Sequence, residues 1–181
     1  MNLTKFLIVN EIKTKIGKEK LILTIFITKQ RDTFSRFHDE STIDTVFIDN
    51  CVNGINGLDE KGSFEGCSSL TEVQIPSSVK NIYNRSFKKC EKLTTVKIDN
   101  NSLIDSIGDD AFSECSSLPH IFIPSKVVSI GSNCFYKCKE LNEVIFEGYS
   151  SLKTIGSYAF SECESLNQID IPSSVEEIGS Y

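Results

Sequence analysis

The chain has 181 residues, of which 39% are hydrophobic and 24% charged, and its formal net charge is −6. This balance is typical of a soluble folded protein and argues against a disordered chain. The charge is uneven: residues 1–36 hold eight Lys/Arg and three acidic residues, whereas residues 37–181 hold eleven and 22. A nucleic-acid groove needs clustered cations, so an acidic body excludes nucleic acid as an expected partner.

Residues 1–36 fit no repeating unit and are predicted as an N-terminal capping segment, with a β-hairpin as one conformation. The apolar runs Phe6–Val9 and Leu21–Ile27 are far shorter than the roughly 20 residues that span a bilayer, so no transmembrane segment is expected. The second run follows a Lys-rich stretch, as a secretory signal would, but TKQRD follows it instead of small residues. A pair of strands is the preferred interpretation.

From residue 64 onward, one unit recurs five times. A Phe is followed after three residues by Cys, after three more by Leu, then by two alternating apolar residues, a turn and a second apolar pair. The three columns are Phe64, Phe87, Phe112, Phe135 and Phe160; Cys67, Cys90, Cys115, Cys138 and Cys163; and Leu70, Leu93, Leu118, Leu141 and Leu166. A degenerate unit starts at Phe37 with Glu40 in the Cys column, so residues 37–181 form the predicted array.

The units predict a solenoid. A unit of 23 or 25 residues cannot bury its own apolar residues, but stacked units can bury them together. In the segment L-x-x-V-x-I, alternation turns the apolar residues inward on a parallel sheet. The stretches 111–132 and 159–180 agree at 15 of 22 positions, and all differences fall outside the Phe, Cys, Leu and Ile columns. Packing therefore fixes the inward positions and leaves the outward ones free.

Short and long units alternate, because successive Cys positions lie 23, 25, 23 and 25 residues apart. In the short units Pro76, Pro124 or Pro172 follows the strand, while IDNNSL and FEGYSSL lengthen the turn in the others. The sequence stops at Ile178-Gly179-Ser180-Tyr181, where Ala-Phe would continue the pattern. We expect a longer natural array, or a last coil covered by a partner, including self-association through this coil.

The unit resembles the BspA-like class of leucine-rich repeats, which read L-x-x-I-x-I-P-x-S-V-x-x-I-G-x-x-A-F-x-x-C, and the resemblance extends from Phe37 to the end. The first unit departs from it, since it lacks the Cys and Pro and has a longer turn, NCVNGINGLDEKGS. The resemblance implies a mostly β leucine-rich repeat solenoid. One parallel sheet would form the concave face, with short turns or 3-10 segments on the convex side.

The cysteine column has two interpretations. It could be a disulfide ladder or a metal site, but stacked Cβ vectors run parallel instead of converging, and no Cys-x-x-Cys pair occurs. The preferred interpretation is that each Cys is a small buried hydrophobe beneath the Phe column. Cys134 takes the small-residue position of Ala111 and Ala159, and Cys51, in the irregular turn, is the cysteine with reactive potential.

No catalytic site is predicted. His38 and His120 are too far apart in the sequence for a metal-ligand spacing, and no Gly-x-Ser-x-Gly, His-Glu-x-x-His or phosphate-loop motif occurs. The many carboxylates are expected to be solvated residues of the solenoid faces. The sequence therefore predicts no enzyme activity, no cofactor and no metal.

The outward strand positions are the candidate binding surface. Phe122 and Ile145 are expected side by side, with His120 and Glu143 beside them and Lys97 one coil away. The full predicted protein-binding set, on the concave face, is Phe122, Ile145, His120, Glu143, Lys97, Gln74, Phe47 and Asp170. Two apolar side chains rimmed by polar ones are typical of a protein-binding spot, although scattered exposed apolar residues are also ordinary.

The predicted function is a non-enzymatic protein-binding module with a protein ligand. The family resemblance implies cell-surface adhesion or binding of host or matrix proteins, and therefore a cell-surface or secreted location. The alternative is an intracellular interaction scaffold in the cytoplasm, which the weak N-terminal signal and the unpaired cysteines favour.

Overall fold

The computed structural model describes residues 22–25, 45–48, 54–55 and 62–180, and this part of the chain contains strands and turns but no helix. The four-residue strands are β1 (Ile22–Ile25), β2 (Thr45–Ile48), β4 (Glu72–Ile75), β6 (Thr95–Ile98), β8 (His120–Ile123) and β10 (Glu143–Phe146). The two-residue strands are β3 (Gly54–Ile55), β5 (Asn81–Ile82), β7 (Ser106–Ile107), β9 (Ser129–Ile130), β11 (Thr154–Ile155) and β12 (Glu177–Ile178).

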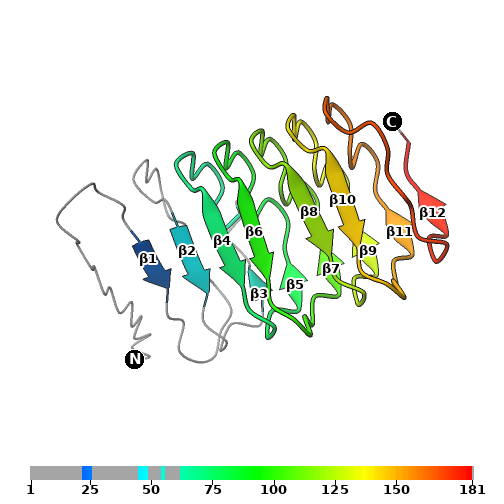
Figure 1. Ribbon diagram of the computed structural model, residues 1–181, viewed down its shortest axis with the longest axis horizontal. Helices are drawn as coiled ribbons and strands as arrows, with labels where there is room; N and C mark the ends of the chain where they lie inside the picture. The colour runs from blue at the N-terminus through cyan, green and yellow to red at the C-terminus, as the bar shows by residue number, and fades with distance from the viewer. Residues whose placement is uncertain (1–21, 26–44, 49–53, 56–61, 181) are drawn as a thin grey trace, which may run out of the picture.

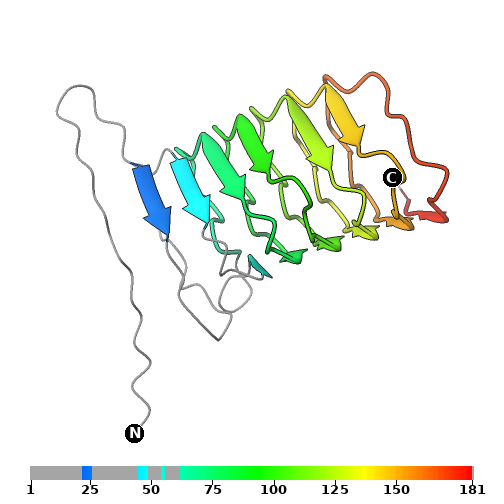
Figure 2. The same ribbon diagram turned by 60° about the horizontal axis from the view of Figure 1, so that its bottom comes forward.

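Successive coils stack into a parallel solenoid, as predicted (Figure 1). The four-residue strands form one side, which we call the long-strand face, and the two-residue strands form the other, the short-strand face (Figure 2). The short-strand face corresponds to the side predicted to hold turns or 3-10 segments. Its two-residue strands instead pair in one six-stranded parallel sheet, from β3 to β12.

The first strand, β1, lies within the predicted capping segment and pairs in parallel with β2 over four positions. It therefore extends the long-strand face by one strand. The rest of residues 1–36, on which the expected hairpin depends, lies outside the described residues, as does Cys51.

The predicted columns form the core. From Phe64 to Phe160 the rings stack nearly parallel, with centroids 5.1 to 5.5 Å apart and interplanar angles of 3° to 12°. Leu118 is fully buried, and Ile169 packs against the core from the last coil. Offset parallel rings retain favourable contacts beyond the burial of area, so the Phe column supports stacking in every coil.

The cysteines pack as the structural interpretation predicts, and the six described ones are free thiols. Each thiol from Cys90 onward in the column donates to the carbonyl of the Phe one coil earlier. The Sγ–O distances are 3.2 Å for Cys90, 3.2 Å for Cys115, 3.2 Å for Cys138 and 3.1 Å for Cys163. Burial raises the pKa of Cys115 and Cys138 well above the usual value and that of Cys163 to about 11, so these thiols are protonated near neutral pH.

Two further sequence features allow the coils to approach closely. The residue before Cys takes a positive φ, for example 62° at Glu114, and the N–H of the Phe two residues earlier then donates to the next coil, as from Phe112 to the Cys134 carbonyl at 2.8 Å. At the Ile-Gly pairs, a Cβ on Gly131 would lie 2.5 Å from backbone atoms of Gly108 and Asp109. Only glycine fits there, which explains the recurring Ile-Gly.

The long-strand face is interrupted where the short-strand face is continuous. Its ladder forms one sheet of β1, β2, β4 and β6 and a second sheet of β8 and β10, while residues 168–171 form no strand. The interruption follows the spacing: strands 23 residues apart pair, and those 25 apart do not.

Proline explains part of this pattern. The N–H groups of Asp99 and Glu147, which follow β6 and β10, donate to the previous coil at Ile75 and Ile123, both at 3.0 Å. Pro124 occupies the same position after β8 and has no N–H to donate. Pro172 does the same after residues 168–171, and Pro119 removes a second donor just before β8.

Candidate functional site

The predicted apolar pair lies on the isolated sheet of β8 and β10. Phe122 pairs in register with Ile145, and His120 pairs with Glu143. Ile145 is 39% exposed, Phe122 is half-buried, and His120 and Glu143 are exposed. The structure therefore brings these four predicted residues together on one face.

The remaining predicted residues are more dispersed. On the four-stranded sheet, Gln74 pairs in register with Lys97, and the Lys97 Nζ lies 2.5 Å from an oxygen of Glu72. Gln74 donates to Asp99 at 3.1 Å. Because β6 and β8 are unpaired, these residues stand across the interruption from Phe122, and the charge of Lys97 is neutralised within its own sheet.

The two outermost predicted residues do not touch the apolar pair through a paired strand. Asp170 accepts a hydrogen bond from Gln168 at 2.9 Å, in a segment without strand structure. Phe47 pairs in register with Gln74 through β2, and its side chain lies outside the described residues.

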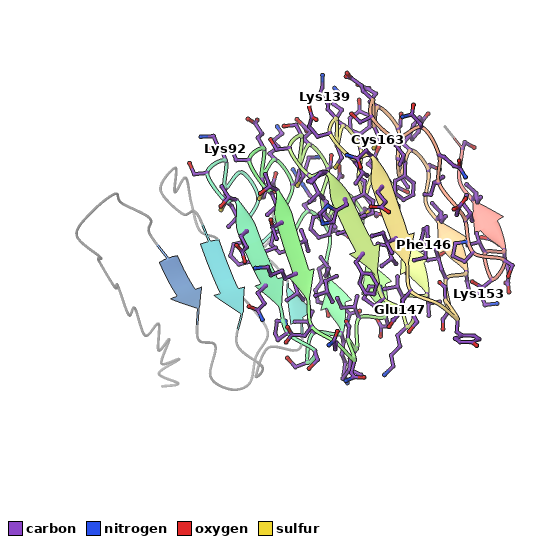
Figure 3. All side chains as sticks on the ribbon, in the orientation of Figure 1. Lys92, Lys139, Phe146, Glu147, Lys153 and Cys163 are labelled. Carbon is purple, nitrogen blue, oxygen red and sulfur yellow. The ribbon has the colours of Figure 1, made fainter. Side chains whose placement is uncertain are left out.

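The interruption exposes apolar residues that the sequence pattern assigns to the core. Val96 and Ile98 on β6 are half-buried, whereas Ile121 and Ile123 at the same positions on β8 are buried. Each coil is covered by the next one, and β8 does not pair with β6. Phe146, labelled in Figure 3 at the end of β10, is also half-buried, because the segment after it does not pair with β10. The prolines beside β8 were the sequence signal for this exposure.

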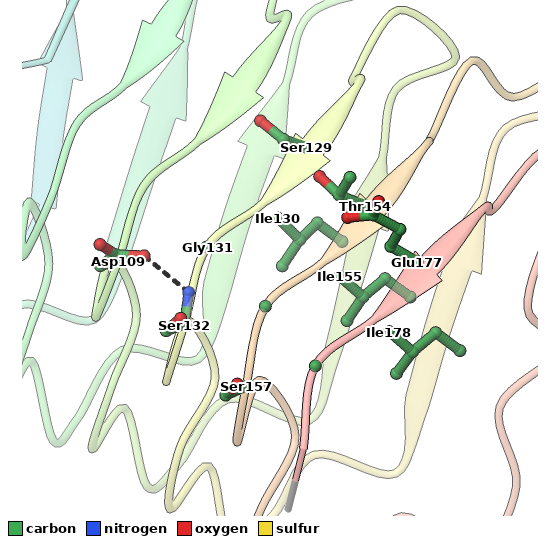
Figure 4. Close-up of a pocket in the computed structure, with 12 residues that line it drawn as sticks. Asp109, Ser129, Ile130, Gly131, Ser132, Thr154, Ile155, Ser157, Glu177 and Ile178 are labelled. Carbon is green, nitrogen blue, oxygen red and sulfur yellow. Dashed lines mark hydrogen bonds between the residues drawn. The ribbon is translucent and has the colours of Figure 1, made fainter.

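An open depression of about 400 Å³ lies on the short-strand face (Figure 4). Ser129, Thr154 and Glu177 follow one another in register along one side, and Asp109 accepts a hydrogen bond from the N–H of Ser132 at 2.7 Å. The lining residues contain hydroxyls and two carboxylates but no histidine, lysine or cysteine that could activate a nucleophile. Its shape follows from the small residues beside the short strands.

In the part of the chain that the structure describes, no three His, Cys, Asp or Glu side chains gather as a metal site would require. The same described residues include no helix long and apolar enough to cross a membrane.

Residues 59–181 match the BspA type leucine rich repeat region in six copies. The chain therefore belongs to the BspA-type leucine-rich repeat family, as its repeat pattern predicted. These repeats are generally protein-interaction modules and typically non-catalytic. No curated protein matches the chain.

Solved structures of bacterial leucine-rich repeat proteins share this fold. A leucine rich cell surface protein of Faecalibacterium prausnitzii is 27% identical, with a TM-score of 0.69 over 90% of this chain and 44% of its own. The leucine rich repeat protein of T. pallidum is 27% identical, with a TM-score of 0.64 over 81% and 73%. The pneumococcal vaccine antigen PcpA, 23% identical with a TM-score of 0.67, covers 91% and 43% and supports the fold alone. The chain thus spans less than half of the Faecalibacterium protein.

Proposed function

We propose that the chain is a non-enzymatic protein-binding module whose ligand contacts the long-strand face around Phe122 and Ile145. The observation that carries this proposal is the paired, outward position of these two side chains on a two-stranded sheet. Large apolar groups with a polar rim are the usual centre of a protein interface. His120 and Glu143 supply that rim.

The proposed location is the bacterial cell surface, with adhesion or binding of a host or matrix protein as the role. Support comes from the neighbour named a cell surface protein and from the vaccine antigen. The competing proposal is an intracellular interaction scaffold, which the free thiols favour because they need no oxidising compartment. Labelling of intact cells with a membrane-impermeant reagent separates the two: a labelled protein supports the surface role, and full protection supports the scaffold.

The double variant Phe122→Ser/Ile145→Ser tests the binding surface. In pull-downs from cell-surface and matrix extracts, the wild-type chain should retain partners that the variant loses. The matched control is Tyr83→Ser/Tyr158→Ser, which removes two exposed aromatic residues away from β8 and β10. Equal capture by the Phe122/Ile145 variant and the wild type would show that the ligand binds elsewhere, provided that both melt at similar temperatures.

A further inference from the structure

The apolar surface near Phe122 is larger than the pair of outward side chains. Ile145 and Phe122 stand on β10 and β8, and the unpaired flank of β8 leaves Val96 and Ile98 half-buried on β6. The equivalent residues of β4, Val73 and Ile75, are fully buried, because β6 pairs with β4. The interruption thus adds apolar surface on the side of Phe122 that faces β6.

The long-strand face is strongly acidic around this surface. Residues 71–76, 94–99, 119–124, 142–147 and 167–172 contain five carboxylates and one lysine, against 25 and 19 Lys/Arg in the whole chain. The lysine, Lys97, is already paired with Glu72. Among the ion pairs between described residues, none includes Glu143, Glu147, Asp99 or Asp170. A partner for this face therefore needs cations.

The carboxylates also have a defined spacing. Along β10 and the residue after it, Glu143, Ile145 and Glu147 alternate as acid, apolar and acid. Glu147 accepts a hydrogen bond from the N–H of Ser125 at 2.7 Å, and this bond lowers the pKa of Glu147, which keeps the carboxylate charged. Alternate residues of an extended peptide point the same way, with about 3.3 Å per residue along the chain. An extended segment lying along β10 would therefore meet the same three-part pattern with the same period.

We infer that the long-strand face binds an extended basic segment of a partner protein, in which one large apolar side chain lies between two cations in the order cation-x-apolar-x-cation. The apolar side chain packs on Ile145 and Phe122, and the cations face Glu143 and Glu147. This inference rests on the proposed function and adds the chemical class of the partner.

Three labelled peptides test the inference by fluorescence anisotropy against the full chain at low salt: GSKTFTKSG, GSETFTESG and GSKTSTKSG. The Lys-Phe-Lys peptide should bind at least about tenfold more tightly than the Glu-Phe-Glu peptide, because charge reversal turns attraction into repulsion. It should also bind about tenfold more tightly than the Lys-Ser-Lys peptide, which cannot bury a ring. High salt should weaken the Lys-Phe-Lys complex.

Two variants locate the charge effect. Glu143→Gln should reduce the preference for Lys over Glu by about threefold while the preference for Phe over Ser remains. The control Glu140→Gln removes an exposed carboxylate of the same coil and should change neither preference.

The outcomes separate the two proposals. Equal binding of the Lys and Glu peptides, or an unchanged preference in Glu143→Gln, overturns the inference about the partner; if Phe122→Ser/Ile145→Ser still loses its pull-down partners, the proposed function stands. Undiminished binding of the Lys-Phe-Lys peptide by Phe122→Ser/Ile145→Ser overturns the inference because the peptide then binds elsewhere. Failure of all three peptides to bind overturns it as well.

Discussion

The two faces of the solenoid respond differently to the same alternation of 23 and 25 residues. The short-strand face pairs through every coil from β3 to β12, while the long-strand face stops pairing between β6 and β8. On the short-strand face, Ile-Gly pairs hold each coil against the previous one at every step, as in the 2.8 Å bonds from Gly131 to Ile107 and from Gly156 to Ile130.

The difference shows where the family fold tolerates variation. The two additional residues fall in the turn after the four-residue strand, and the prolines fall at the end of the following strand. Both changes affect only the long-strand face. Because the other face and the Phe column keep the coils in register, an interrupted ladder leaves the core intact. The interrupted face is the one that carries the proposed binding residues, so structure is relaxed where specificity is needed.

Alkaline pH should disrupt both faces together, with the largest effect. The pKa values of Cys90, Cys115, Cys134 and Cys138 are raised by burial, so the folded state keeps protons that the unfolded state loses. Stability should be fully present below the unfolded thiol pKa of about 8.5 and fall above it, by up to roughly 1.4 kcal/mol per thiol and pH unit. Urea unfolding under reducing conditions from pH 7 to 10 measures this slope.

The variant Cys115→Ala is the control for that slope. It removes one buried thiol, so its stability should fall less steeply between pH 9 and 10 than that of the wild type, even if its stability at pH 7 is lower. Parallel slopes would assign the alkaline loss to groups other than the thiols.

A side chain on the glycine column should break the continuous face. In Gly131→Val the Cβ would lie 2.5 Å from the backbone of the previous coil. Since backbone cannot move aside as a flexible side chain can, we expect a loss of about 4 kcal/mol or more in the free energy of unfolding. Gly148→Ala, where nothing lies within 4 Å of the added Cβ, is the control and should stay within about 1 kcal/mol of the wild type. Similar losses in the two variants would contradict the close approach.

Two matched isoleucines sharpen the contrast along the interrupted face. Ile123 on β8 is fully buried and Ile98, at the same position on β6, is half-buried. We expect Ile123→Ala to cost about 3 kcal/mol and Ile98→Ala about half of that, because less area and less packing are lost at Ile98. Chemical denaturation of both variants gives the two values. Equal costs would mean that β6 is covered as fully as β8.

The smallest effect is expected from repair of the ladder. The double variant Pro119→Asn/Pro124→Glu gives β8 the residues found at Asn142 and Glu147 and restores two N–H donors. Stability should change by only about 1 kcal/mol, since new hydrogen bonds are offset by greater freedom of the unfolded chain. Hydrogen exchange of the restored amides should slow as they bond to β6. Fast exchange would mean that the two-residue insertion alone separates the strands.

Much of the fold could be predicted, because five columns at fixed spacing leave few ways to bury their residues. The adjacency of Phe122 and Ile145 followed from the same spacing, and the structure places the two in register. The exposure of Val96 and Ile98 was not predicted, because both match the core pattern, and their burial depends on a strand 25 residues away. The pairing of Lys97 with Glu72 was also missed, since it joins two coils through side chains that the columns do not constrain.

The sequence by itself determined the solenoid, its inward columns and its family, because periodic burial is a property of spacing along the chain. Only the tertiary structure decided where the coils pair and where they part, because that depends on backbone donors and acceptors of neighbouring coils. A proline removes one donor in the sequence, but whether the strands then separate depends on the contacts that the rest of the coil retains. The charge left unpaired on the long-strand face is decided at the same level, by which side chains meet across coils.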